Sequence, residues 1–333
     1  MTGQWSDAMA AAIALARLGP RSENPRVGCV ILDASGAVVG RGHHRGAGSP
    51  HAEVAALADA GERAHGATAV VTLEPCRHTG RTGPCTEALI DAGITRVVFA
   101  EEDPTREAGG GAAVLRDAGV EVVGGVEAEA AAAVNTAWTH VQRTGRPWVV
   151  LKLAQTLDGR VADARGGPTA ITGAASRAAV HQLRAESDAV LVGANTAVVD
   201  DPQLTVRDQH VEHQPLRVVM GLRALPVGLR VLDDSAPTLI VREHRPAVAL
   251  ALLRDAGVHQ VLLEGGPTVA GAFLDARLVD ELVWLLAPRL LGSGPVSVPG
   301  LMAPVPVSVT QVSRIGDDVL VRGRPLWSTE LER

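Results

Sequence analysis

The sequence predicts an α/β protein built from two domains. Its 333 residues suffice for roughly two domains of ordinary size, each long enough to bury a core of its own. Short apolar runs typical of strands alternate with segments whose apolar residues recur at helical spacing, which is the pattern of layered α/β folds. Aromatic residues make up only 2% of the chain, so valine, leucine, isoleucine and alanine must fill both cores.

The first half of the chain begins with a helix and a hairpin. Residues 7–18 carry apolar side chains at helical spacing, and Gly19 and Pro20 end that helix. Residues 27–32 and 38–40 are expected to form the hairpin, and residues 52–60 a second helix. Strands are then expected over residues 69–73, 96–100 and 120–123, and helices over residues 86–92, 111–118 and 127–141.

The segment 143–147, Arg-Thr-Gly-Arg-Pro, is the expected boundary between the domains, because it follows an alanine-rich helix and precedes a new strand. We therefore expect domains over residues 1–145 and 146–333. The apolar runs of the second half are nearly continuous, which is typical of a sheet covered on both faces. They predict strands over residues 148–154, 189–193, 217–220, 238–241, 260–263 and 281–287, with a proline-rich loop over 298–307 before the last strands.

Composition and charge exclude several classes of function. The net charge is −6 and no basic stripe carries interleaved aromatic residues, so nucleic acid is not expected as a partner. No run of about 18 apolar residues could cross a membrane, and the N-terminal residues lack a signal-peptide pattern, so a cytoplasmic location is expected. Three cysteines do not make a disulfide framework, and paired cysteines in a reducing compartment are better interpreted as metal ligands.

A histidine and two cysteines in the first half have the pattern of a catalytic zinc site. His51 is followed two residues later by Glu53, and Cys76, preceded by proline, is followed by Cys85. One imidazole and two thiolates leave a fourth tetrahedral position open, and zinc lowers the pKa of bound water from about 15.7 to about 7. Glu53 lies beside a ligand without being one, which suits a proton shuttle in the hydrolysis of an amine. The motif predicts a zinc-dependent deaminase.

The spacing of the cysteines departs from the common nucleobase deaminase pattern. Eight residues separate Cys76 from Cys85, where the usual gap is two. Taken singly, each cysteine is better explained as a small core residue, as Cys29 is within its apolar run. The metal interpretation depends on finding both cysteines together with the His51 and Glu53 motif.

The second half lacks the strand, G-x-G-x-x-G and helix unit of an ordinary dinucleotide fold. It does carry Gly265-Gly266-Pro267 directly after an expected strand. Adjacent glycines let backbone amides approach a pyrophosphate, and a helix that starts there favours the negative charge. Alone, this signal is weak, because a Gly-Gly-Pro sequence usually marks only a turn.

Longer motifs identify a family. The segments 24–30, 48–54 and 72–85 closely resemble the deaminase half of the bifunctional riboflavin-pathway deaminase/reductase, and the long gap between the cysteines is specific to it. The segments 151–160, 171–173, 183–185, 188–193, 196–207 and 287–294 resemble its reductase half, in the same order. The resemblance implies a cytidine-deaminase-like three-layer domain followed by a dihydrofolate-reductase-like domain.

The same resemblance implies two consecutive reactions on one small molecule. Zinc-dependent hydrolysis would remove the ring amine of 2,5-diamino-6-(5-phosphoribosylamino)pyrimidin-4-one, and NADPH would then reduce the ribosyl group to ribityl at C1′. The implied zinc ligands are His51, Cys76 and Cys85, and the implied catalytic residues are Glu53 and Asp200, of which Asp200 would act as an acid near C1′. A homo-oligomer, dimer or tetramer, is also implied.

The remaining site residues follow by position from the family motifs. Implied substrate contacts are Asn24, His44, His78 and Arg81 in the deaminase and Lys152, Thr172, Arg184, Leu204, Arg207 and Glu264 in the reductase. Arg81, Arg184 and Arg207 would bind phosphate, since guanidinium pairs well with phosphate oxygens. Implied cofactor contacts are Ala154, Ala170, Thr196, Asp200, Gly265, Gly266, Pro267, Thr268 and Gly271, within a stretch that continues to Ala272.

Several positions have a second interpretation. By composition alone, Asp200 would be a turn residue before Asp201-Pro202, and Arg81 a solvated loop charge. Glu74 is expected to support the site or the fold. Arg223 is a possible contact to the 2′-phosphate of NADPH, although an exposed loop arginine is the commoner case.

Three positions depart from the family pattern. Gly83 stands where proline is more usual, Ala170 where tryptophan is usual, and Leu222 where some members carry serine or threonine. Ala170 and Leu222 bear on cofactor affinity more than on reaction type. Two alternatives remain open: a deaminase of another base, such as guanine, cytidine or tRNA adenosine, and a chain in which one half has become a non-catalytic binding domain.

Overall fold

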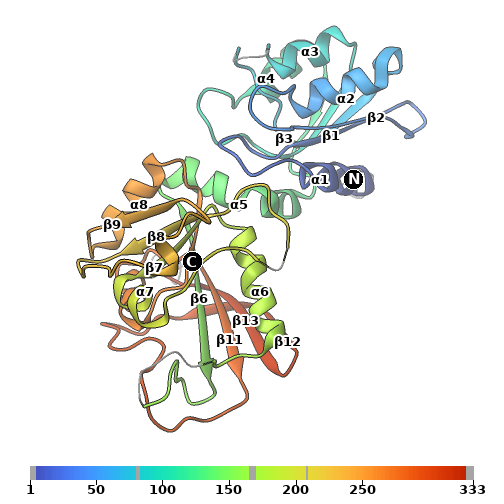
Figure 1. Cartoon of the computed structure of the whole chain (residues 1–333). Coiled ribbons are helices and arrows are strands. Elements are labelled where there is room, and N and C mark those ends of the chain that lie inside the picture. Colours follow the sequence, from blue (N-terminus) through green and yellow to red (C-terminus); the bar gives the residue numbers. More distant parts are fainter. Residues whose placement is uncertain (1–4, 80–82, 165–169, 208, 328–333) are drawn as a thin grey trace. The chain divides into compact units, whose positions relative to one another are not determined.

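The computed structural model describes residues 5–79, 83–164, 170–207 and 209–327, and the chain divides into two units, Met1–Gly145 and Arg146–Arg333 (Figure 1). Each unit has a mixed sheet of its own, with helices packed on it. The predicted α/β fold class is confirmed. Within the described residues, no helix combines the length and hydrophobicity needed to cross a membrane.

The first unit is built on a five-stranded sheet with the order β2-β1-β3-β4-β5. Its strands are β1 (Gly28–Leu32), β2 (Val38–His43), β3 (Thr68–Leu73), β4 (Arg96–Glu101) and β5 (Glu121–Val123). The strand β1 runs antiparallel to β2 and β3, whereas β3, β4 and β5 are parallel. All residues of β1 and β3 are buried, because helices cover both faces of the sheet.

Side chains alternate between the two covering layers, as the pleat of a strand requires. On one face, Cys29 and Ile31 of β1 pack with the helices α2, α3 and α4. On the other face, Val30 and Leu32 pack with α1 and α5. These helices are α1 (Ser6–Ala16), α2 (Ala52–Ala60), α3 (Cys85–Asp91), α4 (Gly111–Asp117) and α5 (Ala128–Thr144), and a short 3-10 helix, η2 (Gly61–Ala64), follows α2. The unit therefore has three layers.

The helix α2, which carries part of the site described below, lies unusually close to β2. A Cβ atom at Gly40 would be 2.3 Å from the carbonyl oxygen of Ala56, and one at Gly42 would be 2.2 Å from that of Ala52. Any side chain at either glycine would push the helix away from the sheet. Glycines on β2 and alanines on α2 thus set the distance between this helix and the sheet, and with it the position of the residues at the start of the helix.

The second unit is built on an eight-stranded sheet with the order β12-β13-β11-β6-β10-β7-β8-β9. Its strands are β6 (Trp148–Thr156), β7 (Ala189–Gly193), β8 (Leu216–Met220), β9 (Thr238–Val241), β10 (Gln260–Leu263), β11 (Glu281–Ala287), β12 (Val307–Ile315) and β13 (Asp318–Pro325). The strands from β11 to β9 are parallel, and β13 and β12 extend one edge in antiparallel fashion.

One face of this sheet forms the main core, and the other face provides a site. Helices α8 and α9 pack on side chains such as Val149, Leu151 and Leu153 of β6. Lys152 and Ala154 alternate with these residues, so they lie on the opposite face. The helices of this unit are α6 (Ala174–Ala185), α7 (Ala194–Asp200), α8 (Pro246–Asp255) and α9 (Pro267–Asp275), and η3 (Arg230–Leu232) is a 3-10 helix.

The expected elements are confirmed, with differences of a few residues at their ends. In the hairpin, β2 runs to His43 rather than residue 40, because Gly42 continues the ladder opposite Cys29, and α5 likewise ends three residues later than expected, at Thr144. The helices α6, α7 and α8 of the second half were not among the elements expected from the sequence. The proline-rich loop leads to the last two strands, as expected.

Candidate functional site

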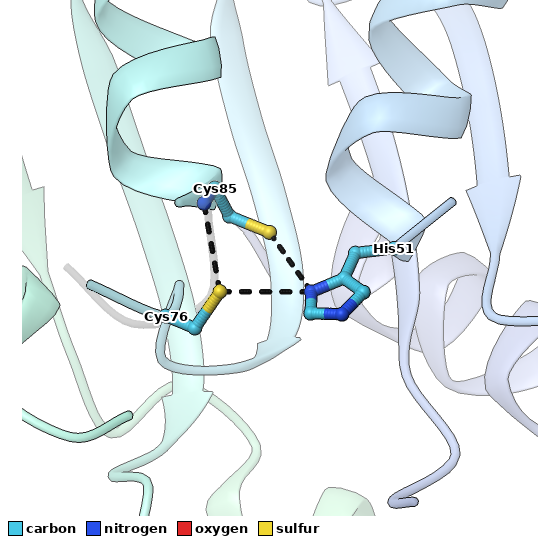
Figure 2. Close-up of side chains that lie close together, drawn as sticks. All are labelled: His51, Cys76 and Cys85. Carbon is cyan, nitrogen blue, oxygen red and sulfur yellow. Dashed lines mark hydrogen bonds between the residues drawn. The ribbon is translucent and has the colours of Figure 1, made fainter. Parts of the chain in front are cut away.

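Three potential metal ligands converge in the first unit, at the ends of two helices (Figure 2). His51 immediately precedes α2, Cys85 is the first residue of α3, and Cys76 lies in the loop after β3. Nδ1 of His51 lies 3.2 Å from Sγ of Cys85 and 3.6 Å from Sγ of Cys76. The structure thus brings together the three residues that the sequence predicted as ligands, and no second such cluster occurs in the described ranges.

The spacing of the donor atoms fits one zinc ion. All three lie within 4.8 Å of one another. At usual Zn–N and Zn–S lengths of about 2.1 and 2.3 Å and a tetrahedral angle, a nitrogen and a sulfur ligand would be about 3.6 Å apart. One imidazole and two sulfurs leave a fourth position for water or substrate, which is typical of a catalytic site.

The surroundings favour the thiolate form that metal binding requires at Cys76, whereas the hydrogen bond with Cys76 and burial raise the pKa of Cys85. A hydrogen bond from the Cys85 thiol, with a smaller contribution from His51, lowers the pKa of Cys76 to about 4 although burial opposes the change. The backbone N–H of Cys85 also points at Sγ of Cys76, at 3.5 Å. That N–H belongs to the first turn of α3, where helix N–H groups have no partner within the helix.

Glu53 lies in the first turn of α2, two residues after the histidine ligand, and its side chain is buried. Burial, joined by the negative charge of Cys76, raises the pKa of Glu53 to about 7. A carboxyl group with such a pKa can take up and release a proton at neutral pH. The geometry therefore suits the proton shuttle that the sequence predicted.

The metal cluster opens into a cavity of about 270 Å³, which Asn24, His44 and His78 help to line. Nδ2 of Asn24 lies 3.2 Å from Nε2 of His44, and Nδ1 of His44 lies 3.3 Å from the carbonyl oxygen of Pro50. Nδ1 of His78 is buried without a hydrogen-bond partner, so it can bind a ligand. Arg81, also predicted here, lies outside the described residues.

Other lining residues were missed by sequence reasoning. The cavity is also lined by Glu23, Glu74, Asp103, Thr105, Glu107, Trp138 and Gln142. Trp138 comes from α5 and donates from Nε1 to the carbonyl oxygen of Glu23, at 3.1 Å. These residues come from loops and a helix far apart in the chain, and no motif links them. Of these residues, only Glu74 was singled out from the sequence, because it directly precedes Pro75 and Cys76.

The second unit has a larger cavity, of about 700 Å³, on the face of its sheet opposite the main core. Most of the residues predicted for the reductase site lie around it. They are Lys152, Ala154, Ala170, Thr172, Thr196, Asp200, Glu264, Gly265, Gly266 and Pro267. Burial raises the pKa of Asp200, although the positive charge of Lys152 opposes the change. A carboxyl group with a raised pKa in such a cavity can donate a proton.

Two charged residues that line this cavity, Lys152 and Glu264, lie near a third, Arg184, which is buried and does not line it. Arg184 donates from Nε and Nη2 to the two carboxylate oxygens of Glu264, at 2.6 and 3.0 Å. Burial alone would raise the pKa of Glu264, but the charges of Arg184 and Lys152 lower it below its usual range. Burial lowers the pKa of Lys152. Glu264 is therefore ionised, and the Lys152 amine is easier to deprotonate than an exposed one.

Four predicted residues line neither this cavity nor the neighbouring one described below. Arg184 is buried, and its Nη1 also donates to the carbonyl oxygen of Thr205, at 3.1 Å, so a phosphate group would compete with these protein partners. Leu204 is buried with a positive φ of 58°. Arg207 is exposed and donates to Gln203 at 3.3 Å. Gly271 lies inside α9. The structure gives these residues no contact with the cavity, and their predicted roles remain predictions.

A neighbouring cavity, of about 790 Å³, shares Asn195, Thr196, Gly266 and Pro267 with the first and continues past the start of α9. Thr268, Ala272, Leu222 and Arg223 line it. Such a pair of joined cavities could hold a substrate and an extended dinucleotide side by side.

The glycines at the start of α9 are required by close packing. A Cβ atom at Gly266 would be 2.7 Å from Oγ1 of Thr196, and one at Gly265 would be 3.0 Å from Cβ of Val269. The N-terminus of α9 therefore meets α7 without intervening side chains, and its first residues line the cavity, where the positive end of a helix favours a pyrophosphate.

Comparisons with known proteins agree with both sites. Residues 3–101 match the cytidine and deoxycytidylate deaminase zinc-binding region, and residues 147–321 match the RibD C-terminal domain. A riboflavin biosynthesis protein RibD of Mycobacterium tuberculosis is 45% identical, over 91% of each chain. That of Escherichia coli is 41% identical, over 93% of this chain and 96% of the relative.

Two solved structures are similar to this chain over nearly its whole length. RibD of Acinetobacter baumannii superposes with a TM-score of 0.89 at 37% identity, over 98% of this chain and 100% of the other. A diaminohydroxyphosphoribosylaminopyrimidine deaminase/5-amino-6-(5-phosphoribosylamino)uracil reductase of Thermotoga maritima also gives 0.89, at 32% identity, over 98% and 99% of the two chains.

Proposed function

The chain belongs to the RibD family of bifunctional riboflavin biosynthesis enzymes, and on this basis we propose how its own residues divide the two reactions. It is a zinc-dependent deaminase and an NADPH-dependent reductase. We assign the deaminase to residues 1–145 and the reductase to residues 146–333, an assignment supported by the extents of the two family matches. The observation that carries the deaminase is the His51, Cys76 and Cys85 cluster beside buried Glu53.

In the deaminase, His51, Cys76 and Cys85 hold the metal and Glu53 moves the proton. A zinc ion bound there lowers the pKa of water to about 7 and so supplies a nucleophile at neutral pH. The carboxylate of Glu53 would accept one proton from that water and pass it to the ring nitrogen, and it would then carry the remaining hydroxyl proton to the departing amine. The pKa of Glu53 is near 7, so at neutral pH this carboxyl group can both accept a proton and release it.

The rest of the deaminase cavity binds and orients the substrate, which is 2,5-diamino-6-(5-phosphoribosylamino)pyrimidin-4-one. Asn24 and His44, coupled by their 3.2 Å contact, face the pyrimidine, and the unpaired Nδ1 of His78 is available to a polar group of the ligand. Arg81 is assigned to the phosphate from the family motif alone. This arrangement fixes the ring so that its amine-bearing carbon faces the open metal position.

In the reductase, the two joined cavities hold substrate and NADPH. The N-terminus of α9 and the Gly265 and Gly266 turn receive the pyrophosphate. NADPH bound there would supply hydride for C1′ of the open-chain sugar, and Asp200 would donate the proton that completes the reduction. Lys152, held by its charge interaction with Glu264, lies in the same cavity and orients the polar groups of the sugar.

Arg223 is assigned to the 2′-phosphate that distinguishes NADPH from NADH. It lines the dinucleotide cavity, and its Nη1 donates to Oδ1 of Asn195 at 2.9 Å. This bond holds the guanidinium at the rim of the cavity with other donors facing outward.

The chain is further assigned to the cytoplasm and to a homo-oligomer, dimer or tetramer. The absence of a disulfide framework from the sequence supports the first assignment. The edge strand β12 supports the second, because it presents the exposed side chains of Val309 and Val312 on a nine-residue strand. Long exposed edges of this kind are usually covered by another chain or element.

One assay tests the central proposal. The zinc-loaded protein is incubated with the diaminopyrimidinone phosphate, with and without NADPH, and the products are identified by mass spectrometry. Without NADPH, an amino group should be exchanged for a hydroxyl. With NADPH, two hydrogens should be added as well. Cytidine and guanine serve as control substrates, and their deamination in place of the pyrimidine phosphate would reject the substrate assignment.

A further inference from the structure

A loop outside the ligand motif forms one wall of the deaminase cavity. This wall loop, residues 103–111, connects the end of β4 to the start of α4, and Asp103, Thr105, Glu107 and Ala108 line the cavity. Within the loop, Oδ1 of Asp103 accepts hydrogen bonds from the N–H and the hydroxyl of Thr105, at 2.8 and 2.6 Å. The wall is thus a defined turn rather than an open connection.

The carboxylate of Glu74 joins this loop to the segment that carries the metal ligand Cys76. Glu74 is 6% exposed, and its Oε1 accepts the N–H of Ala112 at 2.8 Å while its Oε2 accepts the N–H of Asp103 at 3.3 Å. The two acceptors therefore hold both ends of the wall loop. Three residues further along the chain, the N–H of Arg77 donates to the carbonyl oxygen of Ala108, at 3.2 Å.

Glycines allow the loop to lie this close. A Cβ atom at Gly111 would be 1.8 Å from the carbonyl oxygen of Pro75, the residue before Cys76. A Cβ atom at Gly109 would be 2.7 Å from the carbonyl oxygens of Asp103 and of Thr105. Real side chains do not approach backbone to such distances, so only glycine permits both the contact with Pro75 and the turn itself.

We propose that Glu74, together with Gly109 and Gly111, docks the wall loop onto the metal-binding segment and thereby sets the width of the pyrimidine cavity. Glu74 is a positioning residue: it acts on the substrate through the wall loop and leaves the metal and the proton transfer to other groups. The inference rests on the proposed deaminase function, and it adds a determinant of substrate affinity that lies beside, but outside, the ligand set.

The test is Glu74→Gln in the full-length, zinc-loaded protein. Glutamine keeps the shape but offers one acceptor oxygen and an NH₂ group, so one of the two N–H groups loses its partner. We expect the KM for deamination to rise about tenfold, as the loss of one buried hydrogen bond predicts. The kcat should fall less than the KM rises, and zinc should stay at one ion per chain.

A second readout does not depend on activity. Amide hydrogen exchange should become faster in peptides covering residues 103–112 and stay unchanged in α3. The matched control is Glu101→Gln, one strand away, where the half-buried carboxylate has an unpartnered Oε2 and does not line the cavity. The control should leave KM and exchange unchanged. Wild-type protein without deaminase activity would reject the proposed function, and the exchange experiment would still test the docking.

The variant Gly109→Ala disturbs the wall loop without changing Glu74. Its new methyl group presses on the loop's own carbonyl groups and on no atom of the metal-binding segment. It should raise the KM and speed exchange in the same way. Unchanged KM and exchange in both variants would overturn the proposal. Loss of zinc in proportion to activity in Glu74→Gln would also overturn it, because Glu74 would then act on the ligand Cys76 instead of the wall loop.

Discussion

The two active sites of the chain differ in how their residues are gathered. In the deaminase, three donor atoms lie within 4.8 Å of one another and open into a cavity of about 270 Å³. In the reductase, the assigned residues spread around two joined cavities of about 700 and 790 Å³. A metal requires fixed donors at short distances, whereas a site for two large ligands needs only separate patches on its walls. The first kind of site is therefore compact and the second is distributed.

The sites also use charge differently. The deaminase places one carboxyl group, Glu53, where burial brings its pKa to about 7. The reductase gathers Arg184, Glu264 and Lys152 in one buried chain, in which each charge is compensated by the next. Removing one member of a compensated chain leaves another unpaired, whereas removing a lone proton shuttle leaves the fold intact. Variants at the deaminase site should thus give clean losses of activity.

Metal removal provides the largest expected contrast between the two sites. Chelation should abolish deamination and leave reduction of pre-deaminated substrate intact, because no residue assigned to the reductase belongs to the cluster. Wild-type protein should contain about one zinc per chain, and Cys76→Ser should contain much less. Metal analysis and the two assays measure this, and restored deamination after zinc is added back is the control. Equal loss of both activities would mean that the metal supports the whole fold.

The variant Glu53→Gln should separate chemistry from metal binding. It keeps His51, Cys76 and Cys85, so the zinc content should stay normal, but the proton shuttle is lost. We expect deamination to fall by about 10²–10⁴-fold. Reduction of the deaminated substrate, measured in the same preparation, should be unchanged. Deamination at the wild-type rate would assign the proton transfer to another group.

The variant Asp200→Asn tests whether the distributed site has a proton donor of comparable importance. Burial raises the pKa of Asp200, and a general acid must be protonated, so kcat/KM for reduction should fall as the pH rises through that raised value. Asparagine should lower the rate by about 10²-fold and remove this part of the pH profile. A variant that keeps the alkaline decrease would show that another group, such as Lys152, titrates there.

The same contrast explains what could be predicted from the sequence. The strands and the metal ligands were predictable because each follows from local patterns, such as the apolar run of β1 and the spacing of Cys76 and Cys85. The wall residues Asp103 and Trp138 were not, because they meet only after β4, α4 and α5 have packed. Arg184 was assigned to phosphate from its family motif. Its bonds to Glu264 form only because the end of α6, which carries Arg184, packs beside the end of β10, which Glu264 follows. Pair formation in the core cannot be read from either residue alone.

The preference for NADPH over NADH should depend moderately on Arg223. Its guanidinium lies at the rim of the dinucleotide cavity, where solvent weakens a charge-assisted bond to phosphate. We expect Arg223→Ala to reduce the ratio of kcat/KM values for NADPH and NADH by about tenfold, mainly through the KM for NADPH. Exposed Arg277 follows the C-terminal end of α9 and is not among the cavity-lining residues, so Arg277→Ala is a charge-matched control. An unchanged ratio in Arg223→Ala would reject the contact.

The smallest expected effect concerns Ala170, which lines the reductase cavity where the family usually has tryptophan. The side chain of Ala170 is exposed, and its carbonyl oxygen accepts a hydrogen bond from Nη1 of Arg289 at 3.2 Å. That bond fixes the backbone, so a larger side chain would project from a defined point rather than from a loose one. Burying an aromatic ring against the cofactor is worth about 0.5–1.5 kcal/mol beyond the area it covers.

The variant Ala170→Trp should therefore lower the Kd for NADPH by about two- to tenfold and leave deamination unchanged. Fluorescence titration or calorimetry measures the affinity, and Ala170→Leu separates the effect of added apolar area from that of a flat ring. Equal gains in both variants would assign the effect to area alone. An unchanged Kd in both variants would mean that position 170 does not face the cofactor. The cofactor would then occupy only the part of the cavity nearer to the Gly265 and Gly266 turn.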